Sequence, residues 1–214
     1  AIQVTPITLP NQQEFEGVPF PLGLECRTPG ISLDDAVAWL HERREEFCEK
    51  ASRHGAVLFR GFPVATAQDF DRFVAAFDLE NFTYEDSLSN AVRVNRTPRV
   101  FTANEAPPEV SIFFHHELAQ TPYYHARLFF FCEKAAEQGG ATPICRSDVL
   151  WERLAKRHPD FARDCVEKGL KYSNVMPEES DPLSGMGRSW KSTLRAETRE
   201  QAEQRLRGMG YSWE

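Results

Sequence analysis

The segment Phe113-Phe-His-His-Glu-Leu118 holds the densest cluster of chemically active residue types in the chain. On a β-strand, successive side chains point to opposite faces, so His115 and Glu117 would share one face while His116 points to the other. One imidazole nitrogen and one carboxylate oxygen are two of the three protein ligands of a 2-His-1-carboxylate site, which leaves open positions on Fe(II). The spacing therefore predicts that His115 and Glu117 bind a metal ion.

An isolated H-x-E pattern also fits two other interpretations. In the first, His115 and Glu117 form a hydrogen-bonded pair on a half-exposed strand and bind nothing. In the second, the same two side chains bind zinc in a hydrolase, although the sequence lacks H-E-x-x-H and the site would need another nearby ligand. His125 is close enough in sequence to be considered as a third ligand, but we favour a structural role for it.

The amino-acid composition indicates which classes of protein this chain can belong to. The chain has 214 residues, of which 41% are hydrophobic and 27% charged, as expected for a folded domain with a core. The net charge of −7 offers no broad attraction to phosphate backbones or anionic lipids, so neither nucleic acid nor membrane is an expected partner. The five cysteines have no CxxC spacing, which favours a reducing compartment and a cytoplasmic location.

The first part of the chain predicts extended segments followed by helices. Residues 1–31 contain five prolines, which favour an extended arm or edge strand. Apolar spacing predicts one long amphipathic helix over 33–53, preceded by Ser32 as its N-cap. A buried strand is expected at 56–60, and a second helix is expected to begin after Thr66.

The remainder predicts strands around the H-x-E pair and then helices. Residues 79–98 show no period and are expected to form a loop region or a lid. Apolar and aromatic runs predict strands over 112–118, 126–133 and 142–145. Helices are expected over 147–157, from Pro159 to Gly169, and over 196–207 on the surface.

Several segments resemble one family in the same order along the chain. The H-x-E segment continues as Leu-Ala-Gln-Thr-Pro, then come Leu128-Phe-Phe-Phe-Cys-Glu133 and Gly139-Gly-Ala-Thr-Pro143. Other matching segments are Gly55-Ala-Val-Leu-Phe-Arg-Gly-Phe-Pro63, Arg99-Val-Phe-Thr-Ala-Asn-Glu105 and Gly187-Arg-Ser-Trp-Lys-Ser192. Together they resemble the clavaminate synthase-like branch of the taurine dioxygenase superfamily of Fe(II)/2-oxoglutarate oxygenases.

The resemblance implies roles for individual residues. His115 and Glu117 match the first two iron ligands of the family, and Thr142 matches the residue that hydrogen-bonds 2-oxoglutarate. Asn104 lies where the family places polar residues near the substrate or cosubstrate. A strand threonine and a turn-forming asparagine are the plainer interpretations of the last two. The family's third ligand, a downstream histidine, and its 2-oxoglutarate-binding arginine have no match in this sequence.

The resemblance also implies a fold and an activity. The expected fold class is α+β, a double-stranded β-helix (jelly roll) with flanking helices, incompletely represented. Residues 1–214 are expected to be a single domain, the N-terminal portion of a jelly-roll oxygenase. The implied enzyme uses Fe(II), 2-oxoglutarate and molecular oxygen to hydroxylate a small amino-acid-like, anionic or zwitterionic substrate. The alternative is a non-catalytic cupin-like binding or scaffold module, and we expect the 214-residue chain alone to be catalytically incompetent.

Overall fold

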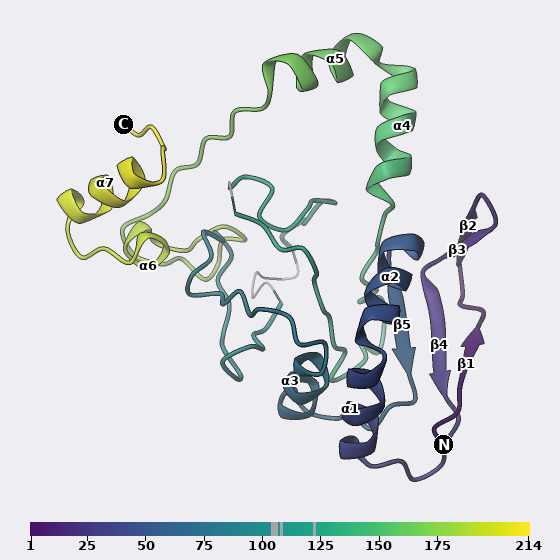
Figure 1. The fold of residues 1–214 in the computed structure, drawn as a ribbon. Coiled ribbons are helices and arrows are strands. Elements are labelled where there is room, and N and C mark those ends of the chain that lie inside the picture. The colour runs from purple at the N-terminus through teal and green to yellow at the C-terminus, as the bar shows by residue number, and fades with distance from the viewer. Residues whose placement is uncertain (104–106, 108, 122) are drawn as a thin grey trace. The chain divides into compact units, whose positions relative to one another are not determined.

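The computed structural model describes residues 1–103, 107, 109–121 and 123–214 (Figure 1). Asn104 lies outside these residues. The chain divides into two compact units, one formed by residues 1–81 with 129–135 and the other by residues 82–128 with 136–214. The candidate metal ligands belong to the second unit.

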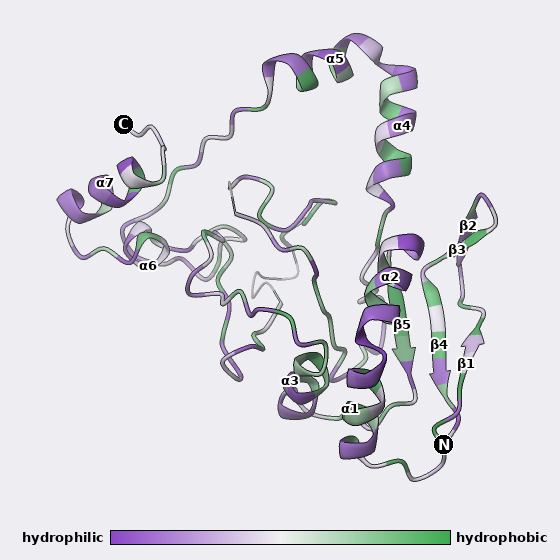
Figure 2. Ribbon diagram, in the orientation of Figure 1, coloured by the Kyte–Doolittle hydropathy of each residue, from purple (hydrophilic) through white to green (hydrophobic). Residues whose placement is uncertain are grey.

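A small mixed sheet organises the first unit. Its strands are β1 (Val4–Ile7), β4 (Leu22–Cys26) and β5 (Val57–Arg60), in the order β1-β4-β5. The central strand β4 is antiparallel to β1 and parallel to β5, so that Leu24 is paired with Pro6 on one side. The N-terminal residues are extended and a strand follows the first helical region, as predicted, but the strand is not buried as expected, since Leu58 is 37% exposed. Figure 2 shows hydrophobic residues along β4 and β5.

A short hairpin precedes β4. Strand β2 (Gln13–Phe15) pairs antiparallel with β3 (Val18–Phe20). The two residues between them, Glu16 and Gly17, have φ of 51° and 77°. Positive φ at both central positions matches the right-handed twist of the strands, and glycine adopts it without a steric penalty.

The predicted long helix over 33–53 is instead two helices, and this expectation was wrong. Helix α1 (Leu33–Glu42) and helix α2 (Arg44–His54) are separated by Arg43, whose φ of −117° and ψ of 12° are not helical. The two ends follow the predicted signals, because the Ser32 side chain accepts from the Asp35 amide and Gly55 follows α2 with φ of 77°.

Both helices and α3 bury apolar side chains in one core. Helix α3 (Ala67–Ala75) follows Thr66, the predicted N-cap, which also forms a complete capping box with Asp69. Phe59 of the sheet meets Phe47 and Phe73 edge to face, with ring centroids 5.1 Å and 5.9 Å apart. The buried residues of this core are Leu24, Ala36, Leu40, Phe47, Phe73, Ala76 and Phe77.

The second unit contains four helices among its described residues. They are α4 (Ser147–Arg157), α5 (Pro159–Lys168), α6 (Trp190–Leu194) and α7 (Arg199–Gly208). Helices α4 and α5 agree with the predictions, α7 begins later than expected, and the short α6 was not predicted. A smaller core is formed by Leu194, Ala196 and Ala202.

The three strands predicted over 112–118, 126–133 and 142–145 are wrong for this structure. No ladder involving these segments occurs among the described residues, and the second unit has only an isolated bridge between Asn95 and Phe101. A strand persists only when its backbone groups are paired, so apolar alternation without a partner leaves Phe113 82% exposed. The described residues form a mixed α and β fold with small sheets, which does not confirm the expected double-stranded β-helix. None of its helices is long and apolar enough to cross a membrane.

Candidate functional site

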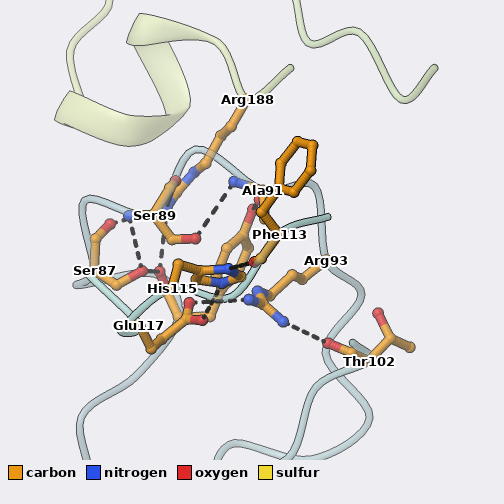
Figure 3. A network of polar contacts seen from close by, with 10 residues as sticks. Ser87, Ser89, Ala91, Arg93, Thr102, Phe113, His115, Glu117 and Arg188 are labelled. Carbon is orange, nitrogen blue, oxygen red and sulfur yellow. Dashed lines mark hydrogen bonds and ion pairs between the residues drawn. The ribbon is translucent and has the colours of Figure 1, made fainter. Parts of the chain in front are cut away.

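The structure brings His115 and Glu117 together. His115 Nε2 lies 3.7 Å from Glu117 Oε2, which is too long for a hydrogen bond (Figure 3). The other ring nitrogen, His115 Nδ1, lies 2.7 Å from the Phe113 carbonyl oxygen. Because a carbonyl oxygen only accepts, Nδ1 carries the proton of the neutral ring and Nε2 keeps its lone pair. With the ring neutral, the pair therefore presents an imidazole lone pair and a carboxylate oxygen side by side, as a metal site requires.

His116 lies away from this pair. Its Nε2 is 2.7 Å from Ser147 Oγ, the hydroxyl of the first residue of α4. The opposite placement of His115 and His116 is what strand alternation predicted, although this segment has no ladder partner. A single residue step along an extended chain is enough to separate the two imidazoles.

Arg93 holds the other oxygen of the Glu117 carboxylate. Arg93 Nη2 donates to Glu117 Oε1 at 3.0 Å, and the two side chains are 13% and 22% exposed. Arg93 Nη1 also donates to the Thr102 carbonyl at 3.3 Å, and the guanidinium lies 5.5 Å from the Phe101 ring centroid. These contacts turn Glu117 so that Oε2, not Oε1, faces His115.

The sequence offered no direct sign of this ion pair. Arg93 is separated from Glu117 by 24 positions, and no periodic pattern connects them. The structure pairs it with the candidate ligand Glu117. The Arg93 side chain thus orients the pair.

His125 is partly buried in the same unit. Its ring meets Phe82 edge to face with centroids 4.8 Å apart. Burial lowers the pKa of His125, with Arg93 acting in the same direction and Glu117 opposing them. The part of the chain that the structure describes holds no group of three or more His, Cys, Asp or Glu side chains able to bind a metal ion. His125 therefore does not complete a site with His115 and Glu117 here.

Of the two predicted cofactor-binding residues, only Thr142 lies within the described residues, and it is not joined to this pair. Thr142 is exposed and lies in an irregular segment after Gly139 and Gly140, which have φ of 65° and 69°. Positive φ at both glycines is typical of turn residues. The 2-oxoglutarate contact of Thr142 stays a prediction, as does the role of Asn104, which falls outside the described residues.

Comparison with known proteins gives the family. Residues 14–208 match the model of the family described as taurine catabolism dioxygenase TauD, TfdA family. A clavaminate synthase-like protein of Arabidopsis thaliana is 40% identical over 98% of this chain and 64% of its own length. The dapdiamide synthesis protein DdaC of Enterobacter agglomerans is 26% identical over 72% of this chain and 44% of its own length.

The chain thus spans less than two thirds of either relative. The match to the family model nevertheless covers most of the chain, and it includes the His115 and Glu117 segment. The chain belongs to the TauD/TfdA dioxygenase family, in its clavaminate synthase-like branch.

Proposed function

We propose that the protein is an Fe(II)- and 2-oxoglutarate-dependent oxygenase that hydroxylates a small anionic or zwitterionic molecule. The observation that carries the proposal is the approach of His115 Nε2 to Glu117 Oε2, 3.7 Å apart, in a chain of the TauD/TfdA family. In the overall reaction, one atom of O₂ enters the substrate hydroxyl group and the other enters succinate, while 2-oxoglutarate loses CO₂.

The two side chains fit Fe(II) as part of its ligand set. A neutral imidazole and an ionised carboxylate are the donor types of the 2-His-1-carboxylate site. Bound Fe(II) would supply the activation of oxygen. The chain's own contribution is to keep the lone pair of His115 on Nε2, through the Phe113 carbonyl, and to present Glu117 Oε2, through Arg93. Protons compete with the metal for the imidazole, so affinity is expected to fall on acidification.

The expected substrate class has support in the second unit. A cavity of about 390 Å³ is lined there by Thr83, Glu85, Asn95, Arg96, Thr97 and Pro98. Arg96 and Glu85 provide charges of opposite sign, which supports a zwitterion, although Glu85 also pairs with Arg195 at 3.7 Å and accepts from the Asn95 amide. One relative is named as a dapdiamide synthesis protein, which supports a small-molecule substrate.

The test uses the protein expressed from its natural gene, purified without oxygen. Fe(II) and 2-oxoglutarate are added, air is admitted, and succinate is measured with and without candidate amino acids. We expect one bound iron and 2-oxoglutarate-dependent succinate, both lost in His115→Ala and Glu117→Ala. Iron binding without succinate from any substrate would contradict an oxygenase.

A non-catalytic binding module is the second candidate. It is favoured by the absence of a third metal-binding side chain near His115 and Glu117 in the described ranges. A module of this kind would bind a small zwitterion with no bound iron and no succinate. The same iron measurement therefore separates the two functions.

A further inference from the structure

Arg188 is a buried cation at the centre of the second unit. The residue is 3% exposed, and its guanidinium donates to the carbonyls of Tyr84, Ser87 and Ser89 at 3.3, 2.9 and 3.3 Å. It also donates to the hydroxyl and the carbonyl of Ser192, both at 3.1 Å. Among the described residues, no carboxylate forms an ion pair with it. Burial of a charge is costly, so a guanidinium placed among carbonyls is expected to serve a specific purpose.

These contacts close the segment 84–91 around the guanidinium. The Arg188 amide donates to the Asn90 carbonyl at 3.0 Å, and the Tyr84 hydroxyl donates to the Ala91 carbonyl at 2.7 Å. Figure 3 shows Arg188 beside Ser89 and Ala91, with Arg93 further along the same segment. Arg93 follows Ala91 by two residues. The backbone conformation that Arg188 fixes over 84–91 therefore determines the backbone position of Arg93.

A series of ring contacts reaches Arg93 by a second route. The Arg188 guanidinium lies 4.4 Å from the Tyr84 ring centroid, and the Tyr84 and Phe101 centroids are 5.7 Å apart. The Phe101 ring in turn lies 5.5 Å from the Arg93 guanidinium, which donates to Glu117. Each cation–π contact stabilises the geometry of the side chains that form it. The backbone and the rings therefore connect Arg188 to Arg93, and through it to Glu117, by two routes that share Tyr84.

We infer that Arg188 is a positioning residue for the metal-binding pair, acting through Arg93 on the Glu117 carboxylate. The inference rests on the proposed function in naming Glu117 as a metal ligand. Arg188 touches neither His115 nor Glu117 in this role. It fixes the segment 84–91 and the Tyr84 ring, and these hold Arg93 where it turns Oε2 of Glu117 toward His115.

The test measures Co(II) binding by the protein expressed from its natural gene, in visible titrations, with thermal unfolding as the check on folding. Arg188→Lys keeps the charge but loses the planar set of donors. We expect its Kd for Co(II) to rise about 10-fold, the usual effect of removing a residue that orients a ligand. Arg199→Lys, on the exposed face of α7, is the matched control and is expected to bind Co(II) like the wild type.

A double-mutant cycle examines the route. Because Arg188 acts through Arg93, Arg188→Lys combined with Arg93→Met is expected to bind Co(II) as Arg93→Met does alone. If Arg188→Lys does not fold, Phe101→Leu interrupts the ring series without touching the buried guanidinium, and it is expected to raise the Kd similarly. Lower thermal stability with an unchanged Kd would show that Arg188 is only structural.

A second readout does not depend on metal. Hydrogen exchange at the Arg93 guanidinium, followed by NMR, is expected to be slow in the wild type and faster in Arg188→Lys. If the wild type binds no Co(II), the proposed function fails while this measurement still decides whether Arg188 positions Arg93. Equal exchange rates in both proteins would overturn the inference.

Discussion

Arg93 Nη2 lies 3.0 Å from Glu117 Oε1, so one oxygen of the Glu117 carboxylate is held by a cation while the other faces His115. The two oxygens of one carboxylate thus have different contacts. The contact with Arg93 explains how the segment 113–118, which has no strand partner, keeps the His115 and Glu117 side chains together. It also separates the effects of nearby substitutions, because a change at Arg93 alters orientation whereas a change at Glu117 removes a ligand.

Substitution of Glu117 is expected to remove most Fe(II) binding and 2-oxoglutarate turnover. Glu117→Ala deletes the carboxylate oxygen that lies beside His115 Nε2, whereas His116→Ala deletes an imidazole bonded to Ser147. Iron content and succinate formation of the two variants are compared at equal protein concentration. A larger loss in His116→Ala would mean that the ligands are assigned to the wrong residues.

Removal of the Arg93 guanidinium is expected to destabilise the protein. Arg93→Met leaves the partly buried Glu117 carboxylate without its donor, which costs about 1 to 3 kcal/mol of unfolding free energy. Arg163→Met is the control, since its pair with Asp160 is exposed and is worth less than about 1 kcal/mol. Urea unfolding at neutral pH gives both values, and equal losses would refute a special role for Arg93.

Thr142 is expected to bind the cosubstrate through its hydroxyl. Thr142→Val keeps the shape but removes the hydrogen bond, so 2-oxoglutarate binding should weaken by about 0.5 to 1.5 kcal/mol, or up to about 3 if a carboxylate is the partner. Iron content should stay the same. An unchanged 2-oxoglutarate constant would leave Thr142 without a binding role, in keeping with its exposed position.

Stability is expected to fall in mildly acidic solution because of His125. Burial lowers the pKa of His125 below its usual 6.5, so the unfolded chain takes up a proton more readily than the folded one. The folded state is therefore fully favoured above pH 6.5 and loses stability as the pH falls from there to the lowered pKa. Urea unfolding between pH 7.5 and pH 5 measures the loss, which His125→Gln should reduce. An NMR titration that places the pKa of His125 above 6.5 would contradict this.

The capping box of α3 gives a prediction for the first unit. Thr66→Ala removes the hydroxyl that accepts from the Asp69 amide at 3.1 Å, and it is expected to cost about 1 kcal/mol of unfolding free energy. Thr66→Ser retains the acceptor and should restore most of the stability. Comparable losses in both variants would indicate that side-chain packing, not the cap, is responsible.

Local signals allowed much of the first unit to be predicted. Ser32, Gly55 and Thr66 mark helix ends through contacts within a few residues, and these are visible in sequence. The break at Arg43 was not predicted, because neither glycine nor proline marks it and the backbone there leaves the helical region on its own. The strand predictions for short apolar runs such as 112–118 were wrong. Alternation indicates which face of a strand would be buried, but it does not indicate whether a partner strand exists.

The candidate site was only partly accessible to sequence reasoning. His115 and Glu117 are two residues apart, so their spacing alone suggested a shared face. Arg93 and Arg188 reach the same region from distant parts of the chain, and only a folded structure shows that they do. Polar interactions over such separations depend on how the segments between them fold, which residue patterns do not encode.

The outer position of β1 in the first sheet has a consequence for self-association. An edge strand presents free backbone groups to which a strand of another molecule can add, and this is a common beginning of aggregation. Pro6 lies within β1 and has no amide hydrogen to offer such a strand. A newly added strand would therefore lose a hydrogen bond in the middle of a four-residue edge, so Pro6 protects this side of the sheet from intermolecular pairing.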